Sequence, residues 1–214
     1  MDEDISIIDS KTRNEKIKIF FINNKRYLIA ILSSIILIIF AYFSYGEIQD
    51  RKTKKLAEKY NNISIKFSTS DKTDVKNELI KIINEKNSTY SPLALYFIID
   101  NEIQSSNEEI NIFFDIIINE VNLDKEIKNL IIYKKALFNA NFETENNLIK
   151  ILNPIINSDS VWKPHALYLL AEYFFDKNQK QKAKEFYNQI LNYKKSNENI
   201  LKETRKRLSR DFSE

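Results

Sequence analysis

Few residues of this sequence belong to types that could carry out catalysis. Of its 214 residues one is a histidine, His165, and none is a cysteine, which leaves no His-based dyad, no thiolate nucleophile and no Cys-ligated metal. Adjacent carboxylates such as Glu108 and Glu109 have no His, Cys or Gly-rich loop beside them in the sequence, so we expect them on a solvated helix face. The sequence therefore predicts no enzyme, no metal, no cofactor and no small-molecule substrate.

The charge balance and the composition restrict the fold and the partners. Lys and Arg number 33 against 30 Asp and Glu, and this net charge of +3 does not favour nucleic acid as a partner. One Gly and three Pro are too few turn-forming residues for a β-rich fold of this length, which predicts an all-α protein. Beyond an N-terminal segment, the remaining length suits one helical domain with its own core.

The segment from Tyr27 to Tyr45 is apolar and has no charged residue. Its length matches the hydrocarbon thickness of about 30 Å that a transmembrane helix must cross. A buried core helix seldom runs this long without a charge, and a signal peptide has a shorter apolar region that ends in small residues. We therefore interpret residues 27–45 as an uncleaved anchor whose partner is the lipid bilayer.

Charges next to this segment bear on its orientation. Lys25 and Arg26 directly precede it, whereas Glu47 and Asp50 directly follow it. This arrangement favours a cytoplasmic N-terminus, although the basic residues over the wider flanks nearly balance.

The chain beyond the anchor divides into two further parts. Apolar residues at helical spacing, from Leu56 to Phe67, predict an amphipathic stalk, and the polar run that ends at Asp71 supplies N-cap residues for the next helix. The run from Leu93 to Ile99 is apolar nearly all round, so we expect its helix to lie deepest. The predicted parts are an N-terminal segment over 1–26 that begins with a flexible arm over 1–10, the transmembrane helix over 27–45, the stalk over 46–70, and a helical domain over 71–214.

One stretch of the helical domain, from Leu167 to Leu191, has the tetratricopeptide pattern of large and small residues. Ala171 and Ala183 let two helices approach closely, and Asn178 can take the left-handed conformation at the end of the first helix. Degenerate copies precede it, which predicts a solenoid of helical hairpins. The residues expected to pack this repeat are Leu167, Leu170, Ala171, Phe174, Ala183, Tyr187 and Ile190.

The C-terminal segment from Lys202 to Arg210 is basic and has two interpretations. Ile200, Thr204 and Leu208 favour a helix that caps the array and turns its basic side outwards. Contact with anionic lipid or nucleic acid is the alternative.

The whole chain resembles a known family, the tetratricopeptide-like inner-membrane proteins related to YfgM, an ancillary subunit of the Sec translocon, in their alphaproteobacterial forms. The resemblance rests on the acidic start, the charged Asn14-Glu15-Lys16, the aromatic pair Phe20-Phe21, Ala41-Tyr42 late in the anchor, Ala57 and Tyr60 in the stalk, and Val161-Trp162-Lys163-Pro164 before the Ala171/Ala183 repeat. It implies a single-pass protein of the bacterial inner membrane with a cytoplasmic N-terminus and a periplasmic repeat domain. The implied partners are the Sec translocon and periplasmic chaperones or exported clients. The near absence of Gly and the blurred middle repeat depart from the family pattern.

Four residues point to the inner surface of the predicted solenoid, namely His165, Tyr168, Glu172 and Phe175. Such surfaces take up helices or extended peptides, so these residues are our candidates for partner binding. Packing on a neighbouring helix is the alternative for Tyr168 and Phe175. We expect Trp162 to be a packing anchor and Pro164 to lie in the first turn of its helix, with Asp159 or Ser160 as cap.

The predicted function is a membrane-anchored scaffold for protein–protein interaction that assists the Sec translocon in handover between clients and periplasmic chaperones. An envelope organiser for cell division or outer-membrane assembly is the alternative, because the same architecture would serve it.

Overall fold

The computed structural model describes residues 15–69 and 71–212. In this part of the chain the fold is all-α: helices are joined by turns and loops, and there is no strand. The flexible arm predicted over 1–10 lies outside the described residues. By its contacts the chain divides into two compact units, which meet between Lys55 and Leu56.

The first unit contains a helical stretch over residues 15–23 and most of the apolar part of α2, which runs from Lys25 to Lys66. α2 is long and apolar enough to cross a membrane, and none of its most apolar window is buried in the protein. The predicted anchor over 27–45 lies within this helix. Large apolar side chains that a water-soluble helix would cover are exposed here, Leu37 and Ile38 among them.

The second unit begins at Leu56, inside the predicted stalk. Leu56 is buried in the core of this unit, and Tyr60, Ile63 and Phe67 pack against that core. The Phe67 ring lies 5.2 Å, centroid to centroid, from the ring of Phe97 in an edge-to-face arrangement. The apolar stripe that predicted a stalk is therefore also the contact of α2 with its own domain.

α3, from Lys72 to Asn84, begins where the sequence predicted a cap. The Asp71 carboxylate accepts hydrogen bonds from the backbone N–H of Thr73 at 2.8 Å and of Asp74 at 3.3 Å. These backbone bonds lower the pKa of Asp71, because they stabilise its charged form. The predicted helix start is confirmed.

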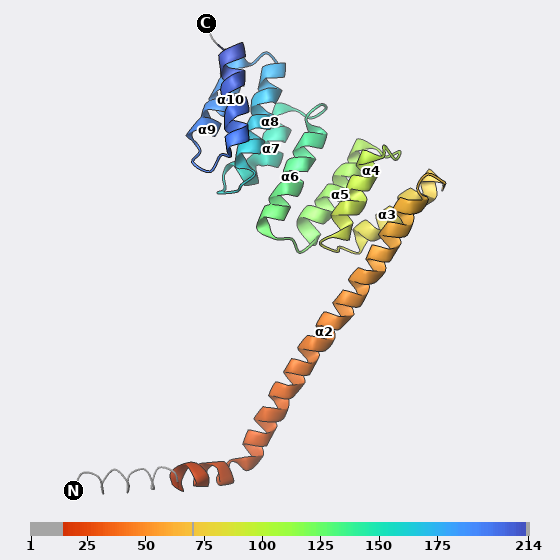
Figure 1. The fold of residues 1–214 in the computed structure, drawn as a ribbon, viewed down its shortest axis with the longest axis vertical. Helices are drawn as coiled ribbons and strands as arrows, with labels where there is room; N and C mark the ends of the chain where they lie inside the picture. The colour runs from red at the N-terminus through yellow and green to blue at the C-terminus, as the bar shows by residue number, and fades with distance from the viewer. Residues whose placement is uncertain (1–14, 70, 213–214) are drawn as a thin grey trace, which may run out of the picture. The chain divides into compact units, whose positions relative to one another are not determined.

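Seven more helices follow in chain order (Figure 1). Ser106, Thr144 and Asn197 cap three of them, each accepting a hydrogen bond from the N–H three residues on, which satisfies a donor that the first turn would leave free. α3 packs closely on α4, α6 on α7 and α8 on α9. Their bounds are α4 Tyr90–Asp100, α5 Asn107–Glu120, α6 Lys125–Asn139, α7 Glu145–Ile156, α8 Lys163–Asp176, α9 Lys180–Asn192 and α10 Glu198–Asp211.

The apolar side chains of this unit form two clusters. One extends from the end of α2 to α6, and the other extends from α6 to α10. α6 contributes to both, since Ile131 lies in the first cluster and Ile132 in the second. In α10, Ile200 and Thr204 are buried and Leu208 packs against the second cluster, as expected of a helix that covers its end.

The expectation that the helix over 93–99 lies deepest is wrong for one face. Ala94, Leu95 and Ile98 are fully buried, but Leu93 is 38% exposed and Tyr96 is only half-buried. The end of α2, α3 and α5 cover the other sides of α4. A helix that is apolar all round can thus keep one apolar face open.

Candidate partner-binding surfaces

The seven residues predicted to pack the repeat are all buried, and they lie on α8 and α9. Ala171 and Ala183 have no exposed surface, which fits their predicted role of letting the two helices approach. Phe174 stacks on Phe186 of α9, with the ring centroids 5.4 Å apart.

The turn between α8 and α9 follows the predicted backbone geometry. Asn178 has a φ of 57°, the left-handed region that Asn enters more readily than most residues. The N–H of Gln179 donates a hydrogen bond to the carbonyl of Phe174 at 2.9 Å, which closes the turn at the end of α8. The prediction for Asn178 is confirmed.

His165 lies in an aromatic cluster at the start of α8. Trp162 stacks on Tyr133 of α6 with centroids 5.9 Å apart, and the His165 ring lies 5.3 Å from that of Trp162. Burial lowers the pKa of His165, and the nearby Val161 backbone only partly opposes this shift. Trp162 is a packing residue, as predicted.

The start of α8 differs from the prediction in one detail. Pro164 lies in its first turn, as expected, but the N-cap residue is Trp162, whose side chain makes no cap hydrogen bond. Ser160 instead accepts from the Trp162 N–H at 3.1 Å, and the Ser160 hydroxyl donates to Glu126 of α6 at 2.7 Å. Asp159 pairs with Lys195 and accepts a hydrogen bond from Tyr193.

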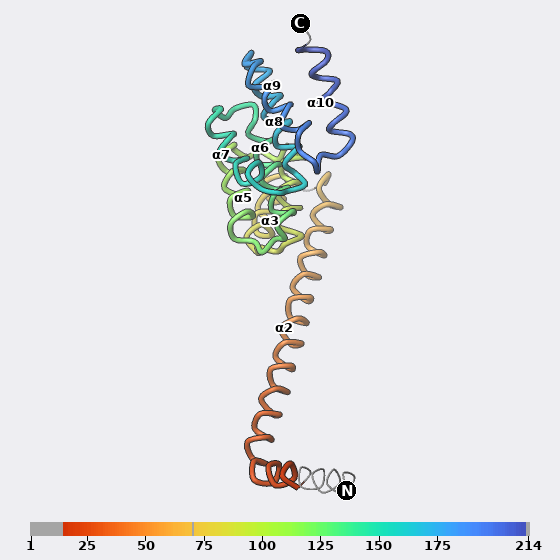
Figure 2. Tube along the Cα trace, turned by 90° about the vertical axis from the view of Figure 1, so that its left-hand side faces the viewer, coloured from red at the N-terminus to blue at the C-terminus, as the bar shows by residue number. Residues whose placement is uncertain are grey.

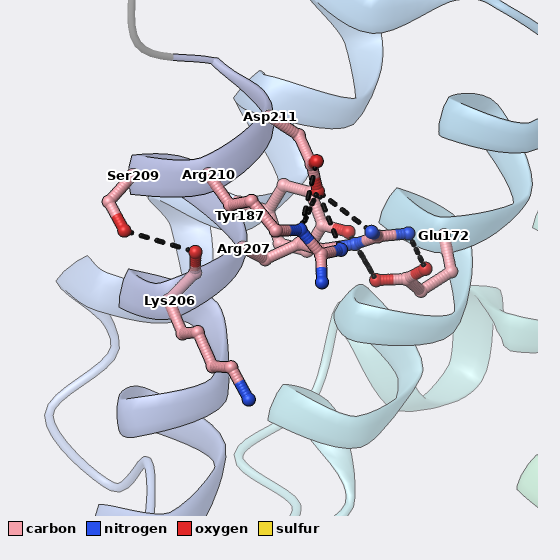
Figure 3. Close-up of polar contacts among 7 residues, drawn as sticks. All are labelled: Glu172, Tyr187, Lys206, Arg207, Ser209, Arg210 and Asp211. Carbon is pink, nitrogen blue, oxygen red and sulfur yellow. Dashed lines mark hydrogen bonds and ion pairs between the residues drawn. The ribbon is translucent and has the colours of Figure 1, made fainter.

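Glu172 is engaged by α10 of the same chain (Figure 3). The Arg207 guanidinium donates to both carboxylate oxygens, from Nε at 2.9 Å and from Nη2 at 2.6 Å, and the Tyr187 hydroxyl donates at 2.5 Å. Burial raises the pKa of Glu172, but the hydrogen bonds from Arg207 and Tyr187 outweigh burial, and the pKa is lowered. The carboxylate therefore stays charged and holds α10.

Phe175 and Tyr168 flank this ion pair. Phe175 lies 5.6 Å from Phe212, centroid to centroid, and the Arg207 guanidinium stands 4.5 Å above its ring. Tyr168 contacts Tyr187 edge to face, and burial, followed by the negative charge of Glu172, raises its pKa to about 12. Both side chains thus pack on neighbouring helices, which was the alternative to partner contact.

The four predicted partner-binding residues do not line one common hollow. His165 and Tyr168 line a hollow of about 310 Å³, and Tyr168 and Glu172 line a second one of about 160 Å³. Phe175 lines neither hollow and packs against Arg207 and Phe212. Partner binding by these four stays a prediction, and a partner that reached Glu172 would have to compete with Arg207.

A wider apolar groove lies between α4 and α6. α5 packs against both helices and keeps them apart, which leaves a hollow of about 590 Å³. Leu93 projects into it from α4 with 38% of its surface exposed, and Ile127 projects from α6 with 45% exposed. The full lining is Ser88, Thr89, Pro92, Leu93, Tyr96, Asn122, Leu123, Asp124, Ile127, Leu130 and Ile131.

Tyr96 places a polar atom in this apolar setting. Its hydroxyl is buried and has no hydrogen-bond partner among the described residues, while Lys134 Nζ of α6 lies 4.4 Å from the centre of its ring. Burial, and secondly the negative charge of Asp100, raise the pKa of Tyr96, so the phenol keeps its proton. The groove thus has an apolar wall with the buried, unpartnered hydroxyl of Tyr96 in it and a cation beside that ring.

The groove was missed in the sequence because its residues are spread over two helices and two loops. One signal was present: the run from Leu93 to Ile99 has more apolar faces than its neighbours can cover. A second was the stripe Ile127, Leu130 and Leu137 of α6, which differs from the buried face that includes Ile131 and Ala136.

Comparison of the chain with protein-family models, with curated proteins and with solved structures finds no match.

Proposed function

We propose that this protein is a membrane-anchored scaffold whose helical domain, built of tetratricopeptide-like hairpins, binds other proteins. The groove between α4 and α6 supports the binding part of the proposal. It exposes Leu93 and Ile127 in a concave setting of about 590 Å³, whereas the side chains behind them, such as Leu95, are fully buried. Concave apolar surfaces with a few polar groups are what amphipathic helices and extended peptides bind.

The anchor defines where this scaffold works. α2 supports a single-pass arrangement because its apolar window is exposed along its whole length and only lipid would cover it. We place the protein in a bacterial inner membrane, with the N-terminus in the cytoplasm and the domain in the periplasm. The resemblance to YfgM-related proteins suggests the Sec translocon and periplasmic chaperones or exported clients as its partners.

Site-specific photocrosslinking in native membranes tests the binding site. A photoreactive phenylalanine analogue at Leu93 or Ile127 should crosslink translocon subunits or exported clients. The matched control is Ile112, which is 58% exposed but lies in the hollow between α5 and α7. Crosslinks from Ile112 but not from Leu93 or Ile127 would contradict binding at the α4–α6 groove. Crosslinks only to cytoplasmic proteins would contradict the proposed location.

Carbonate extraction and protease protection test the anchoring. The full-length protein should stay in the membrane pellet, and protease added to spheroplasts should digest the domain. A protein that washes off, or a domain that is cut only after the inner membrane is opened, would refute the proposed location.

A further inference from the structure

Residues 15–23, just before α2, form a helical stretch that shows apolar side chains to its surroundings. Five large ones are exposed, with Ile17 at 47%, Ile19 at 56%, Phe20 and Phe21 each at 57%, and Ile22 at 64%. The cost of leaving this much apolar surface in water scales with its area, so the stretch needs an apolar partner. Within the first unit, no described side chain of this stretch is buried.

A break separates this stretch from α2. Asn24 is non-helical, and its side-chain Nδ2 donates to the Phe20 carbonyl at 2.9 Å, alongside the backbone bond from Asn24 N–H to the same carbonyl at 3.0 Å. Both views show the chain turning at this point (Figures 1 and 2). The Asn24 side chain thus closes the end of the stretch before α2 begins.

The polarity of the junction with α2 prevents this stretch from continuing the membrane crossing. The junction contains Asn23, Asn24, Lys25 and Arg26. Two charges and two amides are too costly in hydrocarbon, so the junction must lie at the headgroups.

We propose that residues 15–23 lie in the headgroup interface of the bilayer that α2 crosses, as an interfacial helix. The inference rests on the proposed anchoring through α2. Phe20 and Phe21 would enter the boundary of the acyl chains, which are continuous with the lipid around the anchor. Within residues 15–26 there are four basic residues, Lys16, Lys18, Lys25 and Arg26, and one acid, Glu15. This excess of positive charge fits anionic phospholipid headgroups.

Tryptophan fluorescence of the full chain in phospholipid vesicles tests this placement. The single native tryptophan is removed by Trp162→Phe, and one reporter is introduced at a time by Phe20→Trp, Ile36→Trp or Ile65→Trp. Ile36 lies in the middle of the predicted anchor, and Ile65 is 78% exposed near the other end of α2. Circular dichroism checks that each variant keeps its helical content. Lipids brominated close to the headgroup or close to the chain end serve as shallow and deep quenchers.

The inference expects the Phe20→Trp reporter to be quenched more by shallow than by deep bromine. Ile36→Trp should show the reverse order, and Ile65→Trp should be quenched by neither. No quenching of Phe20→Trp, with deep quenching of Ile36→Trp retained, would overturn the interfacial helix and leave the anchor standing. Deep quenching of Phe20→Trp would also overturn it, because the stretch would then be inserted. If Ile36→Trp is not quenched, the anchoring itself fails.

The lipid charge gives a second readout. Phosphatidylglycerol added to phosphatidylcholine vesicles should increase shallow quenching of Phe20→Trp, and added salt should reduce the increase. The double substitution Lys16→Gln and Lys18→Gln should weaken this dependence. Quenching that does not respond to phosphatidylglycerol would overturn the role of the basic residues.

Discussion

The α8–α10 region and the α4–α6 region of the domain are built from similar helices, but their exposed faces differ. In the first, α10 extends over α8, and Arg207 donates to both oxygens of Glu172 across the contact. In the second, no described helix covers Leu93 and Ile127, and the groove between them stays open. An apolar stripe on a helix therefore marks a surface that must be buried. Whether another helix of the same chain or a separate partner buries it does not follow from the stripe itself.

The largest effect should come from the two cores, which we expect to be equally sensitive. Leu170→Ala in α8 and Leu95→Ala in α4 each remove a side chain with no exposed surface and should lower the free energy of unfolding by about 2–5 kcal/mol. Leu93→Ala is the control in the same helix as Leu95 and should cost under about 1 kcal/mol, since its side chain is partly in water. Urea unfolding of the full chain in detergent, followed by circular dichroism, measures all three. A Leu93→Ala cost as large as that of Leu95→Ala would mean that the groove is closed.

The second largest effect should come from the Arg207–Glu172 ion pair, which joins α10 to α8. Arg207→Ala leaves a half-buried carboxylate without its main partner and removes the cation above Phe175, so we expect a loss of about 1–3 kcal/mol. Lys206→Ala in the same helix is the matched control, because Lys206 is exposed and its loss should change stability by under about 0.5 kcal/mol. Equal effects of both substitutions would show that the ion pair does not hold α10.

The smallest expected effect is the pH dependence of the stability that the Arg207–Glu172 ion pair contributes. The pKa of Glu172 in the folded protein lies below its ordinary value of 4.5. Its contribution to stability is therefore present above that ordinary value and is lost as the pH falls through the lowered folded pKa. Comparison of the wild type with Glu172→Gln at pH 7 and at decreasing pH below 4.5 should show the stability difference shrinking. A constant difference over this range would contradict the assignment.

Local features of the fold could be predicted from the sequence because nearby residues determine them. The cap at Asp71, the left-handed Asn178 and Pro164 in the first turn of its helix each depend on the residues beside them. The buried stripe of α8 and α9 follows from helical periodicity and from two small residues at the contact. The uncharged apolar run over 27–45 is also visible in the sequence, and it lies within α2, which is long and apolar enough to cross a membrane.

The candidate sites depend on partners that lie far apart in sequence. Glu172 meets Arg207 from 35 residues away, and nothing in the pattern of α8 marks that carboxylate as engaged. Tyr96 and Lys134 approach each other from helices that α5 separates. Periodicity identifies which side chains lie on the apolar face of a helix. It does not identify which other helix packs on that face.

The buried hydroxyl of Tyr96 already carries a free-energy cost in the unbound protein. It is closed off from water and has no hydrogen-bond partner among the described residues, a state that costs about 1–3 kcal/mol. A bound segment that shifted the groove wall and brought a carbonyl or carboxamide oxygen to this hydroxyl would recover part of that cost, whereas a segment of hydrocarbon only would leave it unchanged. Roughly tenfold preferences between otherwise equally apolar ligands can therefore arise from this one atom.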